Sequence, residues 1–332
     1  MKAIFSLAFT FCLCVPAAAQ TALKCPELIP KIRSLKISRM QPQRRGREWL
    51  EGSPKNVNSV ACDLYGMKTE EAEYDGKHLV LKNSYIYREK AEARAFCENL
   101  KSEEKLTTTF SDEAQSSLDD FCRKNRKKDF GVVQVYDASP SQGRETSRKP
   151  VRQIFRLYSK SGFASEEYAF DPLMNLESVT LYSYDKANNL TEAIANDSEG
   201  RQLKRETYAW NKATNSRTHS VYGETNGLRG KTVFEMRGDG TLRREVRSAY
   251  DSGEQPVTRS EIYCDAKGRP EKELVYDADA AEPRYEYTYS RKSDAKGNWV
   301  EERRTRMIVY NGNRMRDTQY APAITRRELQ YY

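Results

Sequence analysis

A fixed spacing of tyrosines constrains the fold of this chain more than any other feature of its 332 residues. From residue 250 to residue 289, four tyrosines lie 13 positions apart, at Tyr250, Tyr263, Tyr276 and Tyr289. Between Tyr208 and Tyr250, the step from one aromatic or large apolar residue to the next is 14. A fixed period means that one short supersecondary unit is repeated along the chain. The stretch therefore predicts a repeated architecture.

Turn-forming residues stand between the tyrosines and predict hairpins. In the segment from Asp265 to Gly268, the aspartate can accept a hydrogen bond from a nearby backbone N–H, and the glycine can adopt the positive φ that closes a tight turn. About nine residues then remain for each strand, and Val, Ile, Thr and Tyr are frequent among them. Because side chains alternate along a strand, we expect Lys272, Leu274 and Tyr276 to share one face.

Tandem units of this size predict a mainly β fold, an extended antiparallel meander of hairpin repeats over residues 151–332 with roughly ten strands. Charged residues make up 31% of the chain and the mean hydropathy is -0.86, which leaves little apolar surface for a thick core. Repeated units, each burying a little against its neighbour, suit such a composition. The sheet must then curl or rest one face on the amino-terminal region. A closed barrel has less support, because its inward face would need a more regular apolar row than these strands offer.

Three segments of the repeat region resemble YD repeats of the RHS type, namely Tyr184–Leu190, Tyr263–Arg269 and Asp294–Trp299. The resemblance covers about residues 155–332. The end of the chain is similar to small exported bacterial repeat proteins of that kind. The resemblance implies a bacterial β-repeat scaffold that is not an enzyme. The chain departs from the large family members, because only some units keep the Tyr-Asp pair and the chain is short for an RHS shell. Toxin encapsulation is therefore not carried over.

The amino terminus predicts export. Lys2 is followed by an apolar run from Ala3 to Val15 and by a small-residue exit with expected cleavage after Ala19, which is the pattern of a signal peptide. We therefore expect residues 1–19 to be a signal peptide and the mature protein to be periplasmic or extracellular. The run is shorter than the roughly 20 apolar residues of a membrane-spanning helix, so no transmembrane segment is expected.

Cysteine usage predicts disulfide bonds in the amino-terminal part. Five cysteines follow the signal peptide, and four of them precede residue 123. An oxidising compartment favours pairing among them. We predict the disulfide bonds Cys25–Cys62 and Cys97–Cys122, with Cys264 in neither of them. Residues 20–138 are accordingly expected to form a smaller, disulfide-stapled α+β region.

The same region shows patterns of both helices and strands. Apolar residues recur at helical intervals over 88–100 and from Ser111 to Cys122, which predicts two helices. Residues 78–87, entered from a turn at Asp75-Gly76, and residues 132–136 are typical of strands. Residues 139–150 are rich in Pro, Ser and Gly and predict a linker before the repeats.

Candidate catalytic groups are few. The chain has two histidines, His78 and His219, which argues against a histidine-centred triad or a multi-histidine metal site. His219 lies in an alternating stretch typical of a strand. Cys264 has no histidine near it in sequence, so we interpret it as a strand cysteine rather than a nucleophile. No catalytic, cofactor-binding or metal-binding residue is predicted, and no cofactor.

Acidic residues of the repeat region have a structural explanation. Turn aspartates such as Asp197, which precedes Gly200, and Asp294 lack the density of oxygen ligands that a calcium site needs. The adjacent pairs Glu166-Glu167 and Glu301-Glu302 lie on predicted strands, so the two members of each pair point to opposite faces. We therefore do not expect either pair to act as the acid and base of a glycosidase.

Positive charge gathers in the cluster 123–128 and near the end of the chain. The arginines of the second group are Arg303, Arg304, Arg306, Arg314, Arg316, Arg326 and Arg327. Export makes nucleic acid an unexpected partner for such a surface, whereas an envelope protein or an anionic glycan is compatible with it. A solvated face of mixed charge explains the same residues without any partner.

These features favour an exported, non-catalytic β-repeat scaffold that binds a protein or a glycan in the bacterial envelope. Two alternatives stay open. One is an envelope hydrolase whose acidic site is assembled across strands and is not visible in the sequence. The other is a carrier that holds an apolar ligand on a curved sheet.

Overall fold

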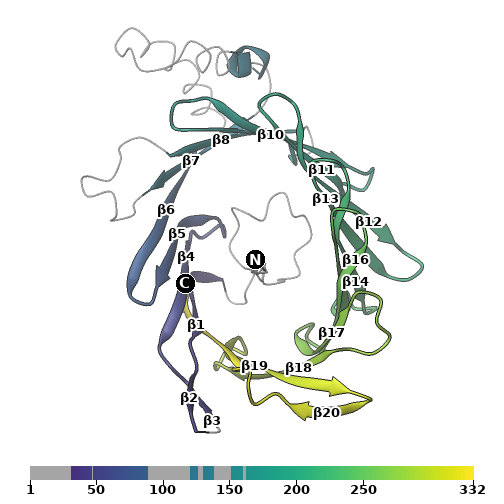
Figure 1. The fold of residues 1–332 in the computed structure, drawn as a ribbon. Helices are drawn as coiled ribbons and strands as arrows, with labels where there is room; N and C mark the ends of the chain where they lie inside the picture. The colour runs from purple at the N-terminus through teal and green to yellow at the C-terminus, as the bar shows by residue number, and fades with distance from the viewer. Residues whose placement is uncertain (1–30, 47, 89–119, 126–129, 138–150, 160–161) are drawn as a thin grey trace.

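The computed structural model describes residues 31–46, 48–88, 120–125, 130–137, 151–159 and 162–332. Within these ranges, eighteen antiparallel strands close into one barrel, which Figure 1 shows as a ring. From β4 to β19, strands that follow one another in the chain are also neighbours in the ring, and β21 and β1 complete the circle. The short β20 forms a hairpin with β19, and β2 pairs with β3 in a separate ribbon.

The strands of the first half are β1 (Ile32–Met40), β2 (Gln43–Arg45), β3 (Glu48–Leu50), β4 (Pro54–Cys62), β5 (Lys68–Asp75), β6 (His78–Arg88), β7 (Phe130–Asp137), β8 (Arg152–Tyr158), β9 (Ala164–Phe170), β10 (Leu176–Tyr184) and β11 (Leu190–Asp197). Those of the second half are β12 (Gln202–Asn211), β13 (Ser216–Tyr222), β14 (Leu228–Met236), β15 (Leu242–Tyr250), β16 (Pro256–Cys264), β17 (Pro270–Asp277), β18 (Tyr285–Ser293), β19 (Trp299–Tyr310), β20 (Asn313–Arg316) and β21 (Ala323–Tyr331). Residues 120–125 are helical.

The predicted hairpin chemistry is confirmed at the turn between β16 and β17. One carboxylate oxygen of Asp265 accepts hydrogen bonds from the backbone N–H groups of Lys267 and Arg269, both at 2.9 Å. The N–H of Gly268 donates to the Asp265 carbonyl, and this glycine has a φ of 74°. Turns that begin at Asp185, Asp197, Asp251 and Asp294 repeat the same pattern of bonds.

A register shift accompanies many of these turns. The pairing of β16 with β17 shifts between Tyr263 and Cys264, immediately before the Asp265 turn, and the pairing of β15 with β16 shifts at Tyr250. A bulge of this kind bends the strand and increases its twist. Bends repeated from hairpin to hairpin give the sheet the curvature that it needs to close.

Closure depends on the strand nearest the amino terminus of the described chain. β1 lies between β21 and β4, and Ile37 is paired with Arg327 on one side and with Asn58 on the other. The side chains of Ser34 and Gln330, 296 positions apart in the sequence, are joined across this junction by a hydrogen bond of 3.0 Å. A closed ring leaves no unpaired strand edge.

Strand alternation separates a lumen face from an outer face. The helical residues 120–125 lie outside the ring, over β8 and β10 (Figure 1). Phe121 from this segment packs on Phe155 and Phe170, with ring centroids 4.8 Å and 6.2 Å away, in an apolar cluster on the outer face. Residues paired directly across strands share a face, so the register extends this assignment around the barrel. Ile262, Glu273, Tyr287 and Arg306, for example, form one lumen-facing row.

The expectation of an open sheet is wrong, and the closed barrel is the correct alternative. The prediction assumed that an inward face must carry a regular apolar row. A barrel of about 16 to 18 strands is wide enough to keep a polar lumen, and charged side chains on the lumen face here are satisfied by ion pairs and by contacts with rings. Such a wall needs no apolar row.

The expectation of a separate α+β region is also wrong for residues 31–88 and 130–137. These residues supply β1 and β4 to β7 of the same barrel that the repeat region forms. The predicted strands over 78–87 and 132–136 are confirmed by β6 and β7. Of the two predicted helices, residues 120–122 are helical, and 89–119 lie outside the described residues, as do the predicted signal peptide 1–19 and the linker 139–150.

The disulfide-stapled α+β region is not what the described residues form, and the two predicted pairs stay predictions. Cys62 and Cys122 are disulfide-bonded, but the predicted partners Cys25 and Cys97 lie outside the described residues. Cys264 is buried and is not part of a disulfide bond, in agreement with its expected place outside the pairs. No helix among the described residues is long and apolar enough to span a bilayer.

Candidate ligand-binding site in the barrel lumen

A cavity of about 520 Å³ lies on the lumen side of the wall formed by β15 to β19, β21 and β1. Its volume falls within the range of small-molecule sites, roughly 300 to 1,000 Å³. Seven cationic side chains line it: Arg39, Arg247, Lys267, Arg269, Arg291, Arg304 and Arg327. The carboxylates in the same lining are Glu273 and Glu302, so cations outnumber anions.

A row of alternating arginine and tyrosine side chains, which we call the arginine–tyrosine ladder, runs along the lumen face of β18 and β19. Its members are Tyr285, Tyr287, Tyr289, Arg291, Arg304 and Arg306. The guanidinium of Arg304 lies 3.6 Å from the ring centroid of Tyr287, and that of Arg306 lies 4.4 Å from the ring of Tyr285. A cation over an aromatic face gains about 2 kcal/mol when both are desolvated. The ladder thus holds guanidinium groups in fixed places.

The two carboxylates of the cavity are each engaged by an arginine. Glu273 is 3% exposed, and it accepts hydrogen bonds from the Arg304 guanidinium at 2.7 Å and from the Tyr289 hydroxyl at 2.5 Å. Burial and the charge of Glu273 raise the pKa of Tyr289, so this phenol stays protonated and donates. Glu302 accepts from the Nε of Arg291 at 2.7 Å. Neither carboxylate is placed as an unengaged acid or base.

Arg327 differs from the other arginines of the cavity. It is 6% exposed, and its guanidinium lies 3.5 Å from the ring centroid of Trp299. Among the described residues its Nε atom has no hydrogen-bond partner. Burial lowers the pKa of Arg327 to about 10, with Glu302 acting against the shift and the like charge of Arg291 adding to it. A buried charge without an ionic partner is costly to a folded protein.

A second lumen cluster lies farther along the wall, on β10 to β13, beside a cavity of about 170 Å³. Its centre is Glu206, which contacts Lys204, accepts from the Tyr208 hydroxyl and lies 3.1 Å from the Nε2 of His219. The rings of Tyr208 and His219 stack at 4.6 Å. Burial raises the pKa of Glu206, but the hydrogen bonds from His219, Lys204 and Tyr208 outweigh it and hold this pKa at about 2. Glu206 is a fully engaged carboxylate, which favours a structural role.

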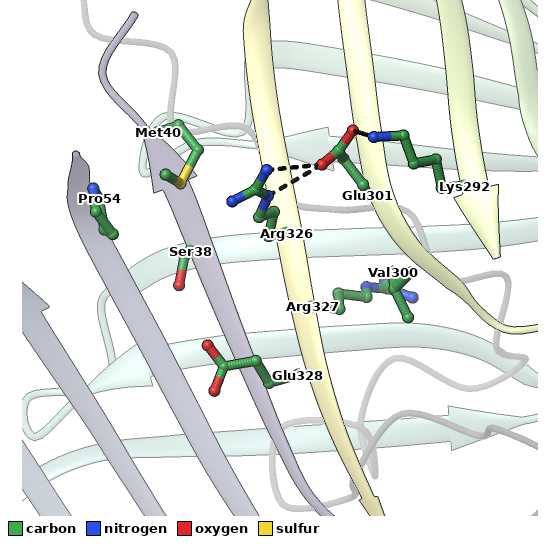
Figure 2. A pocket seen from close by; sticks show the side chains of 9 residues that line it. All are labelled: Ser38, Met40, Pro54, Lys292, Val300, Glu301, Arg326, Arg327 and Glu328. Atoms are coloured by element: carbon green, nitrogen blue, oxygen red, sulfur yellow. Dashed lines mark hydrogen bonds and ion pairs between the residues drawn. The ribbon is translucent and has the colours of Figure 1, made fainter. Parts of the chain in front are cut away.

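The outer face near the main cavity carries a shallower pocket of about 330 Å³ between β1, β19 and β21. Figure 2 shows Glu301 in this pocket between Arg326 and Lys292, to which it is joined at 3.0 Å and 2.7 Å. The direct pairing of β19 with β21 ends at Glu301 and Arg326. Arg327, the next residue along β21, lines both this pocket and the lumen cavity.

The structure places the acidic pairs as predicted. Glu301 lies on the outer face with Arg326, while Glu302 lies on the lumen face with Arg291. Glu166 and Glu167 are likewise separated: Glu166 accepts from an outer-face tyrosine hydroxyl, and Glu167 is paired with a lumen arginine, Arg156. The turn aspartates Asp197 and Asp294 accept backbone N–H groups of their own turns, as their turn chemistry predicts.

The remaining candidates lie in strands. His219 is in β13, as expected, and His78 is the first residue of β6. Cys264 ends β16 and packs with Ile262 and Leu242 in a small apolar cluster. Within the described residues, no group of three or more His, Cys, Asp and Glu side chains could hold a metal ion.

Sequence reasoning missed the lumen cavity. Its lining comes from seven strands and two connecting segments that are separated by up to about 290 positions, and no local motif joins them. The arginine-rich end of the chain was a partial signal, because three of its seven arginines, Arg304, Arg306 and Arg327, prove to face the lumen. The strand register, which cannot be read from the sequence, separates these lumen-facing arginines from Arg303 and Arg326, which face outward.

Comparison with known proteins gives no family. No protein-family model matches the chain, and no curated protein matches it. Solved structures that match include a porin-like protein from Bacteroides uniformis, with 8% identity, a TM-score of 0.43 and coverage of 90% of this chain and 98% of that one. Others are TcdB2-TccC3-Cdc42 and TcdB2-TccC3, with 10% and 9% identity and TM-scores of 0.17 and 0.19. Those two matches cover 79% and 82% of this chain but 20% of each of the other chains. Similarity at this level carries no argument about function.

Proposed function

We propose that this protein is an exported, non-catalytic binding protein that holds an anionic ligand in the lumen of its barrel. The observation that carries the proposal is the cavity of about 520 Å³ in which seven cations face two carboxylates. Both carboxylates are already engaged by arginines of the same wall. Arg247 and Arg269 are likewise paired, with Glu245 and Asp265 just outside the lining. The positive charge offered to a ligand therefore comes mainly from Arg327 and Lys267.

The arrangement of the arginines supports binding rather than a general surface charge. Clefts lined by one sign of charge raise the local concentration of oppositely charged ligands. Arg291 and Arg304 are held over tyrosine rings and paired with carboxylates of the same wall, so little side-chain freedom is lost when a ligand binds. A carrier of a wholly apolar ligand is less well supported, since such a ligand would leave these charges buried and unsolvated.

The polar outer face of the wall supports a barrel that is surrounded by water rather than by lipid. Ion pairs lie on the outer face of widely separated strands, such as Lys82 with Glu70, Arg205 with Glu192 and Lys36 with Glu328. A membrane-spanning barrel presents an apolar band on this face. Together with the signal-peptide pattern at residues 1–19, this wall favours a periplasmic or extracellular protein. An acidic glycan of the envelope is then the ligand class that best fits both the location and the lumen charge.

A binding experiment tests the proposal. The purified mature protein is titrated with trigalacturonate, a short acidic glycan, and with maltotriose, a neutral glycan of the same length, and heat release is measured. We expect trigalacturonate to bind at low salt and to weaken as salt rises from about 0.05 M to about 0.5 M, because screening reduces the attraction. Maltotriose should not bind. Equal binding of the two glycans would count against an anionic ligand, and binding of neither would count against an acidic glycan as the ligand.

A further inference from the structure

We propose that Arg327 is the recognition point of the lumen cavity, and that it binds a phosphate or carboxylate group of the ligand by a forked pair of hydrogen bonds. The inference rests on the proposed function and names the chemical group that the cavity recognises. It starts from a contrast within the lining: Arg304 and Arg291 have carboxylate partners at 2.7 Å, while Arg327 has no ion pair among the described residues.

The burial of Arg327 makes this contrast informative. Its side chain is 6% exposed, so water does not solvate the guanidinium as it solvates a surface arginine. Lysine and arginine are almost never fully buried without a partner, and a planar guanidinium is suited to bind the two oxygens of a carboxylate or phosphate. An incoming oxyanion would supply the missing partner.

The surroundings hold Arg327 in place for such a contact. Trp299 supports one face of the guanidinium at 3.5 Å, which leaves the in-plane N–H groups as the donors for a ligand. The backbone of Arg327 is held on one side by pairing with Ile37 of β1, and the preceding residue, Arg326, is the last residue of β21 paired with β19. Burial and the nearby Arg291 lower the pKa of Arg327 to about 10, and a neighbouring anion would relieve this destabilisation of the charged form.

The chain offers a matched control in the next residue. Arg326 is on the same strand but on the outer face, where it is paired with Glu301 and Glu51. Arg326→Gln and Arg327→Gln remove the same charge from the same strand. A contribution of net charge alone would affect both variants equally, whereas a direct contact with the ligand would affect only Arg327→Gln.

The test uses the full mature chain and three probes: inorganic phosphate, glucose 6-phosphate and trigalacturonate. We expect Arg327→Gln to weaken binding of the acidic probes by roughly 10- to 100-fold, as expected for loss of a charge-assisted hydrogen-bond pair. Arg326→Gln should change affinity by less than about twofold. Arg327→Lys, which keeps the charge but not the fork, should fall between them. Binding of inorganic phosphate alone indicates a free oxyanion as the ligand. Binding of glucose 6-phosphate or trigalacturonate without binding of inorganic phosphate indicates an oxyanion on a larger molecule.

Thermal unfolding of the ligand-free variants separates recognition from a structural role. If Arg327 serves recognition, Arg327→Gln removes an unpaired buried charge, and the unfolding temperature should stay level or rise. A marked fall in that temperature, or failure to fold, would overturn the inference in favour of a structural arginine. Unchanged affinity in Arg327→Gln would overturn the inference while leaving the proposed function in place. No binding of any acidic probe by the unsubstituted protein would overturn both.

Discussion

The two faces of the barrel wall use the same residue types in different ways. On the outer face, Lys36 and Glu328 pair at 3.3 Å with side chains that are 45% and 69% exposed. On the lumen face, Arg304 and Glu273 pair at 2.7 Å with side chains that are 16% and 4% exposed. Exposed pairs contribute little to stability, whereas a buried pair becomes a liability if one member is lost. The difference between the faces is therefore one of solvation and not of composition.

The same contrast explains how a chain with a thin apolar supply holds a wide barrel. The outer face has one apolar cluster of note, where Phe121, Phe155 and Phe170 meet beneath the helical residues 120–125. Two smaller apolar clusters lie around Leu35 and around Ile262, and much of the remaining wall is joined by backbone pairing and by polar contacts on both faces. In the lumen these contacts are organised by rings, as in the arginine–tyrosine ladder, so that buried charges have defined partners.

The largest expected effect comes from breaking a lumen ion pair. Glu273→Gln removes the buried negative charge that faces the Arg304 guanidinium at 2.7 Å, and we expect the free energy of unfolding to fall by roughly 3 to 5 kcal/mol. Glu328→Gln, the same change on the outer face, should cost about 0 to 1 kcal/mol. Denaturant unfolding of both variants measures the two values. Equal losses would show that the faces do not differ in solvation.

A pH-dependent effect is expected at Glu206. Its pKa is about 2 in the folded protein, against about 4.5 for an ordinary glutamate, so its contribution to stability is complete above about pH 4.5 and is lost as the pH falls toward 2. Glu206→Gln should therefore be less stable than the unsubstituted protein by roughly 2 to 3 kcal/mol at neutral pH. The difference should shrink as the pH approaches 2. Chemical unfolding of the two proteins across this range checks it, and a constant difference would contradict the assignment.

A smaller effect separates the rings of the two faces. Tyr287 supports Arg304 in the lumen at 3.6 Å, while Tyr263 on the outer face lies 5.5 Å from Arg244 and 4.8 Å from Lys272. Tyr287→Leu should cost about 2 kcal/mol because it removes a desolvated cation–π contact, and Tyr263→Leu about 0.5 to 1 kcal/mol. Thermal unfolding of the pair provides the measurement. A larger loss in the Tyr263 variant would reverse the proposed ranking.

The smallest effect is expected at an outer-face lysine. Lys292 is 73% exposed and pairs with Glu301 at 2.7 Å, so Lys292→Ala should change the free energy of unfolding by less than about 0.5 kcal/mol. The change should vanish at about 1 M salt, where screening acts within about 3 Å. Unfolding at low and high salt is the test. A loss of more than about 1 kcal/mol that persists in salt would mean that the outer pair is effectively buried.

The strand-and-turn unit could be predicted from the sequence, because its determinants are local. The spacing of Tyr250, Tyr263 and Tyr276 and the Asp265–Gly268 turn fix hairpin length and geometry without reference to the rest of the chain. Alternation also placed Glu301 and Glu302 on opposite faces correctly. What the period did not indicate is that residues 31–88 belong to the same sheet, since their turns and aromatics do not follow it.

Closure and the lumen site could not be predicted, because both depend on contacts between distant strands. The ring closes where β1 meets β21 and β4, and no pattern in residues 32–40 specifies those partners. Whether an arginine such as Arg327 faces water or the lumen depends on its register with Ile37. An apolar row, the usual indicator of an inward face, is replaced here by arginine–ring contacts, which single-residue hydropathy does not register.

The hairpin geometry has a consequence for how such a barrel can change size. Each hairpin carries its own turn bonds and its own bulge, as at Asp265 and Tyr263, so one more copy needs nothing from the rest of the wall except two neighbours with which to pair. Two added strands lengthen the circumference by about 10 Å. Duplication or loss of a hairpin would thus widen or narrow the lumen in fixed steps. Barrels of this type with different numbers of hairpins would then admit ligands of different size.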